Sequence, residues 1–218
     1  MSDMAVRMLA VDDHPVVAQG LLALAAIADP NLHSLGTATS YAGLREALDR
    51  LETPPDIVLM DLHLEDGTDP VDTIAELTDQ GLRVVILTSE LRPVPIRRAM
   101  QAGAVGLCLK SDEPAHILDV VRAAASGEFA VSSDLAFVLI SDADLIAQLA
   151  PREVEALSLL ADGVPRKVVG DRMDPPVAMS TVVTYLNRAC ERYRQMGREI
   201  ATPRDAVKAA IQDGYLDA

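Results

Sequence analysis

The sequence predicts a doubly wound, five-stranded parallel α/β sheet followed by a small all-α domain. Short apolar segments alternate with segments of helical period over the first 125 residues, and from Pro151 onward only the helical period remains. Apolar segments of four to six residues are typical of strands covered on both faces, as in an open parallel sheet. Strands that alternate with helices along the chain define the α/β class.

Five strands and five helices are expected in the first domain, residues 1–127. Gly81, Gly103 and Gly127 close three of the helical segments, where a left-handed residue is favoured. The strand near His33–Gly36 is the least apolar of the five. The expected strands are Val6–Val11, His33–Gly36, Ile57–Met60, Val84–Leu87 and Val105–Leu109, and the helices are Val16–Ala28, Leu44–Leu51, Val71–Thr78, Ile96–Ala102 and Ile117–Ala125.

The rest of the chain is expected to be helical. An apolar stretch over Leu135–Leu149 predicts a linker helix within residues 128–148, and residues 149–218 form the second domain. Pro151 and Pro203 stand where proline is favoured, in the first turn of a helix. The helices expected in the second domain are Pro151–Ala161, Pro165–Met173, Ser180–Met196 and Pro203–Asp213.

Composition limits the class of protein. No apolar run is long enough to span a bilayer, the first residues lack a secretory signal pattern, and Cys108 and Cys190 have no metal-ligand neighbours. We therefore expect a cytoplasmic protein without a membrane partner. Motifs of P-loop proteins, serine hydrolases and zinc proteases are absent from the sequence. An enzyme with a diffusible substrate is accordingly not expected.

The net charge of −14 is distributed unevenly along the chain. Residues 1–144 hold 9 basic and 23 acidic residues, whereas residues 145–218 hold 10 of each. The total charge alone would argue against nucleic acid as a partner, but the neutral second domain removes that objection.

Chemically selective side chains follow the expected strands. Asp12 and Asp13 follow the first strand, Asp61 the third, Thr88 the fourth and Lys110 the fifth. The carboxyl ends of parallel strands meet at one edge of a sheet, where Mg²⁺ relieves the repulsion between carboxylates. Taken alone, each residue has a simple structural explanation, but the joint pattern predicts an aspartyl-phosphate site. Asp61 would attack a phosphoryl donor while Mg²⁺ and Lys110 neutralise the transferred charge.

Four sequence blocks resemble the signature blocks of response-regulator receiver domains, whose fold is flavodoxin-like. The blocks read VDDH, IVLMDLHL, ILTS and AGAVGLCLK, over Val11–His14, Ile57–Leu64, Ile86–Ser89 and Ala102–Lys110. The resemblance covers about residues 5–125 and implies a sensor histidine kinase as phosphoryl donor. It also implies a role for each site residue: Asp61 is the phosphoacceptor; Asp13, Asp61 and the His63 backbone carbonyl ligate Mg²⁺; Asp12 acts through water; Thr88 and Lys110 contact the phosphoryl group.

The chain departs from this family at the step that reports phosphorylation. The family usually carries Tyr or Phe three residues before the lysine, and this ring swings inward when the threonine engages the phosphoryl group. Leu107 stands at that place here, and Pro93 and Pro95 restrict the start of the next helix. An intact phosphoryl site with an altered relay is the expectation.

The second domain resembles the LuxR-type helix-turn-helix of NarL/FixJ response regulators. The resemblance starts at LAPREVEALSLLADG, Leu149–Gly163, and makes Ser180–Met196 the recognition helix. Recognition helices of this kind enter the major groove, and basic side chains position them on phosphates. The implied base-reading residues are Val183, Thr184 and Asn187, and the expected phosphate contacts are Lys167, Arg188 and Arg192.

The helix-turn-helix also departs from its family. Val183 stands where the family has lysine, Ala150 stands where it has a threonine cap, and residues 174–176, Asp-Pro-Pro, lengthen the turn before the recognition helix. That turn either reorients the helix or bulges into solvent. The arginines of this region form either a phosphate-binding stripe, which we favour, or a solvated face balanced by acidic neighbours: Arg188, Arg192, Arg194 and Arg198.

The leading hypothesis is a two-component regulator of transcription. Mg²⁺-dependent phosphorylation of Asp61 would change dimerisation or release of the second domain, and a homodimer would bind a double-stranded DNA operator. The alternatives are a regulator that acts through protein contacts, or one that binds DNA independently of phosphorylation.

Overall fold

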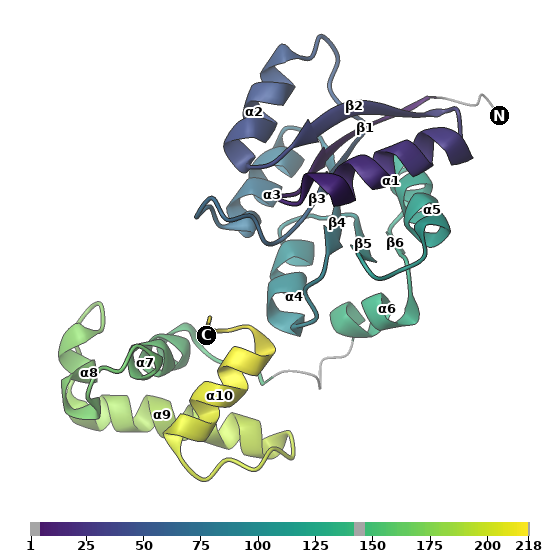
Figure 1. Cartoon of the computed structure of the whole chain (residues 1–218). Helices are drawn as coiled ribbons and strands as arrows, with labels where there is room; N and C mark the ends of the chain where they lie inside the picture. The colour runs from purple at the N-terminus through teal and green to yellow at the C-terminus, as the bar shows by residue number, and fades with distance from the viewer. Residues whose placement is uncertain (1–4, 142–146, 218) are drawn as a thin grey trace. The chain divides into compact units, whose positions relative to one another are not determined.

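The structure is a computed structural model that describes residues 5–141 and 147–217 (Figure 1). The chain divides into two compact units, and the first unit ends at Ser141. No helix among the described residues has both the length and the apolar character needed to cross a membrane.

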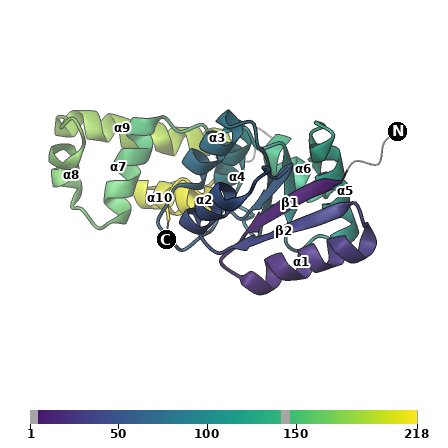
Figure 2. The ribbon, with the colours of Figure 1, turned by 90° about the horizontal axis from the view of Figure 1, so that it is seen from above.

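The first unit is built on a parallel sheet with the strand order β2-β1-β3-β4-β5-β6. Side chains of β1 alternate between the two faces: Leu9 and Val11 belong to one apolar core, and Met8 and Ala10 to the other. Figure 2 shows β1 and β2 side by side, with α1 along them. The strands are β1 (Val6–Val11), β2 (Leu32–Ala38), β3 (Ile57–Met60), β4 (Arg83–Thr88), β5 (Gly106–Leu109) and β6 (Ala130–Val131).

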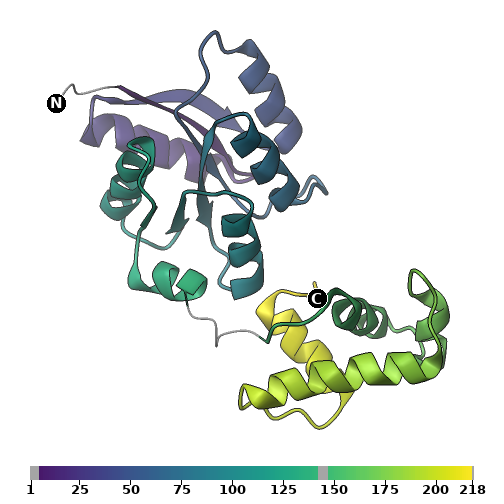
Figure 3. The same ribbon diagram turned by 180° about the vertical axis from the view of Figure 1, so that it is seen from behind.

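Helices cover both faces of this sheet, which confirms the predicted doubly wound fold. Side chains of α1 and α5 pack in one core, and side chains of α2, α3, α4 and α6 in the other. Figure 3 shows α2, α3 and α4 on the face away from α1. The helices are α1 (Pro15–Ala28), α2 (Tyr41–Arg50), α3 (Pro70–Asp79), α4 (Pro93–Gln101), α5 (Pro114–Ala125) and α6 (Asp134–Ser141).

The predicted strand count needs correction, and part of the predicted linker helix is described by the structure. A sixth strand, β6, pairs with β5, with Gly106 opposite Ala130 and Leu107 opposite Val131. The first part of the apolar stretch that follows forms α6, which packs Ala136 and Leu139 into the core of the first unit. An apolar segment predicts a helix but not its packing partner. The remainder of the predicted linker, residues 142–146, lies outside the described residues.

The second unit is a small helical bundle around one apolar core, as predicted. Its core contains Leu157 of α7, Val169 of α8, Leu186 of α9 and Ala206 of α10. The residues of α8, the turn after it and α9 have the order of a helix-turn-helix. The helices are α7 (Pro151–Ala161), α8 (Arg166–Arg172), α9 (Met179–Gln195) and α10 (Pro203–Asp213).

Gly106 permits the close approach of β5 to its neighbours. A Cβ atom at this position would lie 2.9 Å from Val120 Cγ1 and 3.1 Å from the Ala130 carbonyl oxygen, whereas Gly20 in α1 has open space around it. We expect Gly106→Ala to lower the free energy of unfolding by about 1–3 kcal/mol through overpacking. Gly20→Ala is the matched control and should raise it by about 0.5–1 kcal/mol, because glycine is unfavourable inside helices.

Urea unfolding of the full chain, followed by circular dichroism, measures both changes. Equal midpoints for the two variants would contradict the close approach of β5 and β6.

Candidate functional site: an acidic strand-end pocket and a helix-turn-helix face

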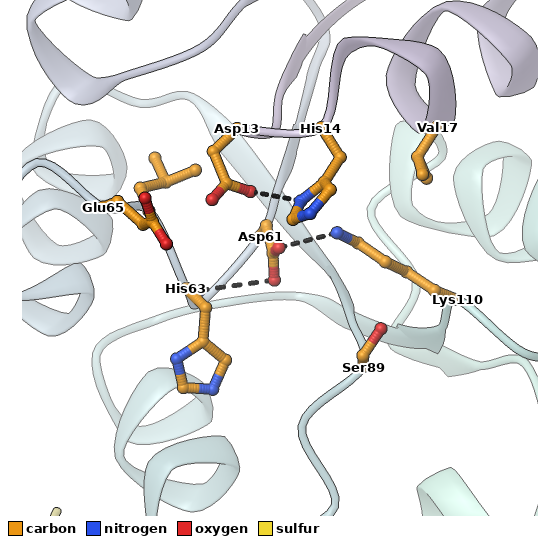
Figure 4. Close-up of a pocket in the computed structure, with 9 residues that line it drawn as sticks. Asp13, His14, Val17, Asp61, His63, Glu65, Ser89 and Lys110 are labelled. Atoms are coloured by element: carbon orange, nitrogen blue, oxygen red, sulfur yellow. Dashed lines mark hydrogen bonds and ion pairs between the residues drawn. The ribbon is translucent and has the colours of Figure 1, made fainter.

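An open pocket of about 490 Å³ lies at the carboxyl ends of the strands (Figure 4). Asp13 from the β1–α1 loop, Asp61 after β3, Ser89 after β4 and Lys110 after β5 all line it. The doubly wound topology brings these loops together because every strand runs in the same direction. Of the predicted strand-end residues, the structure therefore places Asp13, Asp61 and Lys110 around a single pocket, whereas Asp12 and Thr88 are buried and do not line it.

Lys110 is the centre of the site. Its Nζ lies 2.6 Å from Asp61 Oδ2 and 2.7 Å from Asp12 Oδ2, and both carboxylates are buried. Burial alone would lower the pKa of the ammonium, but its hydrogen bonds to Asp12 and Asp61 outweigh this effect and raise the pKa above its ordinary value. Lys110 is therefore a permanent cation at neutral pH.

The residues at the end of β1 suit a hard divalent cation. Asp12, Asp13 and His14 each offer a ligand atom, and these atoms lie within 4.8 Å of one another. Two of the three donors are carboxylates, the groups that Mg²⁺ prefers. Asp61 lies beside this group, because Lys110 contacts both Asp12 and Asp61. The ligand role of the His63 backbone carbonyl stays a prediction.

Three contacts at or beside the pocket were not predicted from the sequence. His63 Nε2 lies 2.8 Å from Glu90 Oε2, and the Glu90 backbone N–H donates to Thr88 Oγ1 at 3.1 Å. His14 Nδ1 lies 2.7 Å from Asp13 Oδ1. Glu90 is buried, and a buried charged side chain needs partners. The one sequence signal for it was its position two residues after Thr88, close to the carboxyl end of β4.

Leu107 is fully buried in β5. It belongs to the apolar core shared with α4 and α6, and its carbonyl accepts the Ser132 N–H at 3.1 Å. An aliphatic side chain in this position has no ring to reorient toward Thr88. The structure thus has a buried aliphatic side chain at the place where the sequence comparison expects an aromatic ring.

The long turn before α9 is held against the helices that flank it. Asp174 N–H donates to Glu155 Oε1 at 2.8 Å, and Val177 N–H donates to the Gly170 carbonyl at 2.9 Å. A Cβ atom on Gly170 would lie 2.3 Å from the Val177 carbonyl oxygen, so only glycine permits this approach. All three residues of the Asp-Pro-Pro segment are nevertheless exposed, so the turn protrudes into solvent while these hydrogen bonds hold its ends.

The residues predicted to read bases lie along the N-terminal half of α9. Thr184 and Asn187 are exposed, and Val183 is half-buried. The Thr184 hydroxyl donates to the Ser180 carbonyl at 3.0 Å, so its methyl group remains for contact with a thymine methyl. Lys167 of α8 and Arg188 of α9, two of the predicted phosphate contacts, are also exposed.

Three of the four arginines predicted to form a phosphate-binding stripe interact with groups inside the second unit. Arg192 Nε lies 2.9 Å from Glu153 Oε2, whose side chain is buried, and Glu153 also accepts the Ala150 N–H at 2.9 Å. Arg194 donates to the Ile200 carbonyl at 2.8 Å, and Arg198 is ion-paired with the buried Asp213. Arg188 is therefore the strongest phosphate-contact candidate of the four.

An acidic pocket with a half-buried lysine at the carboxyl edge of a doubly wound sheet, joined to a helix-turn-helix unit, is the arrangement of a response regulator. The model of the response regulator receiver domain matches residues 8–122. The chain belongs to this family, with the domain organisation of the NarL/FixJ type.

Known proteins of similar organisation match most of the chain. The transcriptional regulatory protein LiaR of Bacillus subtilis is 33% identical, over 83% of this chain and 87% of LiaR. The nitrate/nitrite response regulator protein NarL of Escherichia coli is 29% identical, over 87% and 90%. The structure of RcsB from Salmonella enterica serovar Typhimurium, bound to a promoter, has a TM-score of 0.68, 19% identity and 97% coverage of both chains. This last likeness shows the fold alone.

Arg188 and Arg192 provide a matched test of the two arginine roles. Arg192→Ala should lower the free energy of unfolding by about 1–3 kcal/mol, because it leaves the buried Glu153 carboxylate without its cation. Arg188→Ala should leave stability within about 0.5 kcal/mol, as is usual for exposed positions, while it weakens DNA binding. Urea unfolding and a DNA-binding titration of each variant provide the check. A stable Arg192→Ala variant would exclude the structural role.

Proposed function

We propose that this protein is a phosphorylation-controlled, DNA-binding regulator of transcription. The observation that carries the proposal is the bridge of Lys110 between Asp12 and Asp61 in an open pocket. The bridge holds the Asp61 carboxylate 2.6 Å from the Lys110 ammonium, which can neutralise charge on a group that this carboxylate attacks. We assign Asp61 as the phosphoacceptor and a sensor histidine kinase as the donor.

The phosphoryl transfer uses the groups around this pocket. A carboxylate oxygen of Asp61 forms a bond to phosphorus while the bond from phosphorus to the donor nitrogen breaks, and the donor histidine leaves as a neutral imidazole with a proton. Lys110 and the Thr88 hydroxyl then contact the phosphoryl oxygens and stabilise their charge. Asp13, Asp61 and the His63 backbone carbonyl would hold Mg²⁺ directly and Asp12 through water, and the bound ion would neutralise further negative charge.

The DNA-binding step belongs to the second unit. Thr184 and Asn187 on α9 are exposed for contact with base edges, and Lys167 and Arg188 for contact with phosphates. A homodimer would place two such helices one DNA turn apart. The related proteins NarL and LiaR carry names of the same functional class, which supports this proposal.

DNA binding that does not respond to phosphorylation is the second candidate, and Leu107 favours it. Its buried aliphatic side chain offers no ring to follow Thr88, so the phosphoryl state could be uncoupled from output. Both candidates use the same DNA-binding face, and they differ only in whether phosphorylation of Asp61 changes DNA binding.

Phosphoryl uptake tests the assignment of Asp61. Incubation with acetyl phosphate and Mg²⁺ should add one phosphoryl group to the wild-type chain and none to Asp61→Asn, as measured by intact-protein mass spectrometry. Lys110→Met should reduce uptake by at least about tenfold, because the variant loses the cation at the transferred group. Asp66→Asn, in the loop after Asp61, is the control and should label normally. Labelling of Asp61→Asn at the wild-type level would remove Asp61 from the role.

Selection of genomic DNA fragments separates the two candidates. Fragments recovered only with beryllofluoride and Mg²⁺, a mimic of aspartyl phosphate, would support phosphorylation control. Equal recovery with and without the mimic would favour the second candidate. In either case the affinity should fall as salt rises, because bound phosphates release counterions. Recovery of no fragments would contradict both and support a regulator that acts through protein contacts.

A further inference from the structure

The outer side of α9 is built largely from small and apolar side chains. Figures 1 and 3 show α7 and α10 on one side of α9, and the buried Val182, Leu186 and Tyr193 pack with residues of these helices in one core. With about 3.6 residues per turn, the side of α9 opposite to these three residues is centred on Thr184. The chemistry of the residues around Thr184 therefore decides which groups α9 offers to a DNA groove.

One flank of this outer side is an apolar strip. Met179 and Val183 are four positions apart, so they are neighbours along the helix surface, and Asn187 continues the same row. Met179 is 39% exposed and Val183 is half-buried, so hydrocarbon from both side chains reaches the surface. In the major groove, apolar side chains contact the C5 methyl group of thymine. The strip formed by Met179 and Val183 therefore fits thymine.

Thr184 presents its methyl group to the same surface. Its hydroxyl donates its single proton to the Ser180 carbonyl at 3.0 Å, a bond that directs the hydroxyl at the helix backbone. A hydroxyl that is free to rotate can pair with any base, whereas a methyl group favours thymine. Thr184 therefore extends the hydrocarbon surface of Val183.

Asn187 supplies the hydrogen-bonding group of this surface. Its side chain is exposed, and no hydrogen bond to any described residue engages the side-chain amide. A carboxamide matches adenine, because it donates to N7 and accepts from the N6 amino group. Since adenine pairs with thymine, Asn187 and the methyl groups of Val183 and Thr184 select the same kind of base pair.

The cations of α9 are largely engaged elsewhere. Arginine and lysine are the side chains that recognise guanine, through its O6 and N7 atoms. α9 contains no lysine, and two of its three arginines bind groups of the second unit: Arg192 contacts Glu153, and Arg194 donates to the Ile200 carbonyl. Neither of these two arginines is available for a guanine.

Arg188 is the remaining cation of α9, and its position favours a phosphate. It lies about 140° around the helix axis from Val183, on the flank of Thr184 that is away from the apolar strip. Glu191, about two turns after Thr184, is exposed, and its carboxylate repels the DNA backbone. The contacts with bases therefore end near Arg188, which borders them at the phosphates.

We propose that α9 reads a half-site of A·T pairs and makes no contact that selects guanine. Met179, Val183 and the Thr184 methyl group contact thymine methyl groups, and Asn187 pairs with adenine. The inference rests on the proposed function, because it names the class of operator that the second unit binds. Val183 is the residue that sets this specificity, since a lysine at its place would offer a donor to guanine.

Selection of random-sequence duplex DNA by the full chain, with and without beryllofluoride and Mg²⁺, identifies the half-site. Titrations with modified bases then test how it is read. Deoxyuridine in place of a contacted thymine should lower the affinity about fourfold, because it removes one buried methyl group. In place of the contacted adenine, 7-deazaadenine should lower it about tenfold, because N7 is lost. Replacement of guanines by 7-deazaguanine should leave the affinity unchanged.

Thr184→Ser and Thr184→Val form a matched pair of variants. Thr184→Ser keeps the hydroxyl and loses the methyl group, so it should bind the thymine and deoxyuridine duplexes equally at the contacted position. Thr184→Val keeps a methyl group and loses the hydroxyl, so it should retain the preference for thymine. In the same selection, Val183→Lys should replace one A·T pair of the half-site by G·C.

Three results would overturn the inference and leave the proposed function standing: a selected half-site with an invariant, 7-deazaguanine-sensitive guanine, an affinity that is unchanged by deoxyuridine, or a loss of thymine preference in Thr184→Val that Thr184→Ser does not show. If Val183→Lys fails to fold, the two Thr184 variants decide. Recovery of no DNA with or without beryllofluoride would overturn both the inference and the proposed function.

Discussion

The ammonium of Lys110 between the carboxylates of Asp12 and Asp61 is the interaction on which the site depends. Two buried carboxylates a few ångströms apart repel each other, and one cation at 2.6 and 2.7 Å compensates both. These three side chains follow β1, β3 and β5, so the bridge forms only when the central strands run parallel and end at the same level. The apolar strands and the helices packed on both faces of the sheet hold these strand ends in place, and thereby bring the three side chains together.

Local patterns predicted most of the fold and the residue types of the site. Strands and helices could be predicted because their hydrophobic periods depend only on residues close together in the sequence. The grouping of Thr88 with the aspartates came from the rule that the loops after parallel strands lie at one edge of the sheet. β6 escaped prediction because two residues carry no period. The apolar stretch after β6 predicted a helix but not the surface that it covers, and in the structure Ala136 and Leu139 of α6 belong to the core of the first unit.

Pairing between distant side chains could not be predicted from the sequence. The four arginines of the α9 region look alike as a sequence pattern, yet Arg192 pairs with Glu153, 39 positions earlier, and Arg198 with Asp213. The contact between His63 and Glu90 likewise joins the loops after β3 and β4. Sequence patterns identify which residues are charged, whereas the tertiary fold decides which charges are already neutralised and which remain for a ligand.

The uneven charge of the two units has a consequence for how ionic strength acts on DNA affinity. Salt weakens the attraction between the cationic side chains of the second unit and phosphates, but it also screens the repulsion between the acidic first unit and the same duplex. The two effects have opposite signs. As salt rises, the DNA affinity of the full chain should therefore fall less steeply than that of the second unit alone. The acidic first unit weakens nonspecific binding to DNA by charge repulsion, and this repulsion is strongest at low ionic strength.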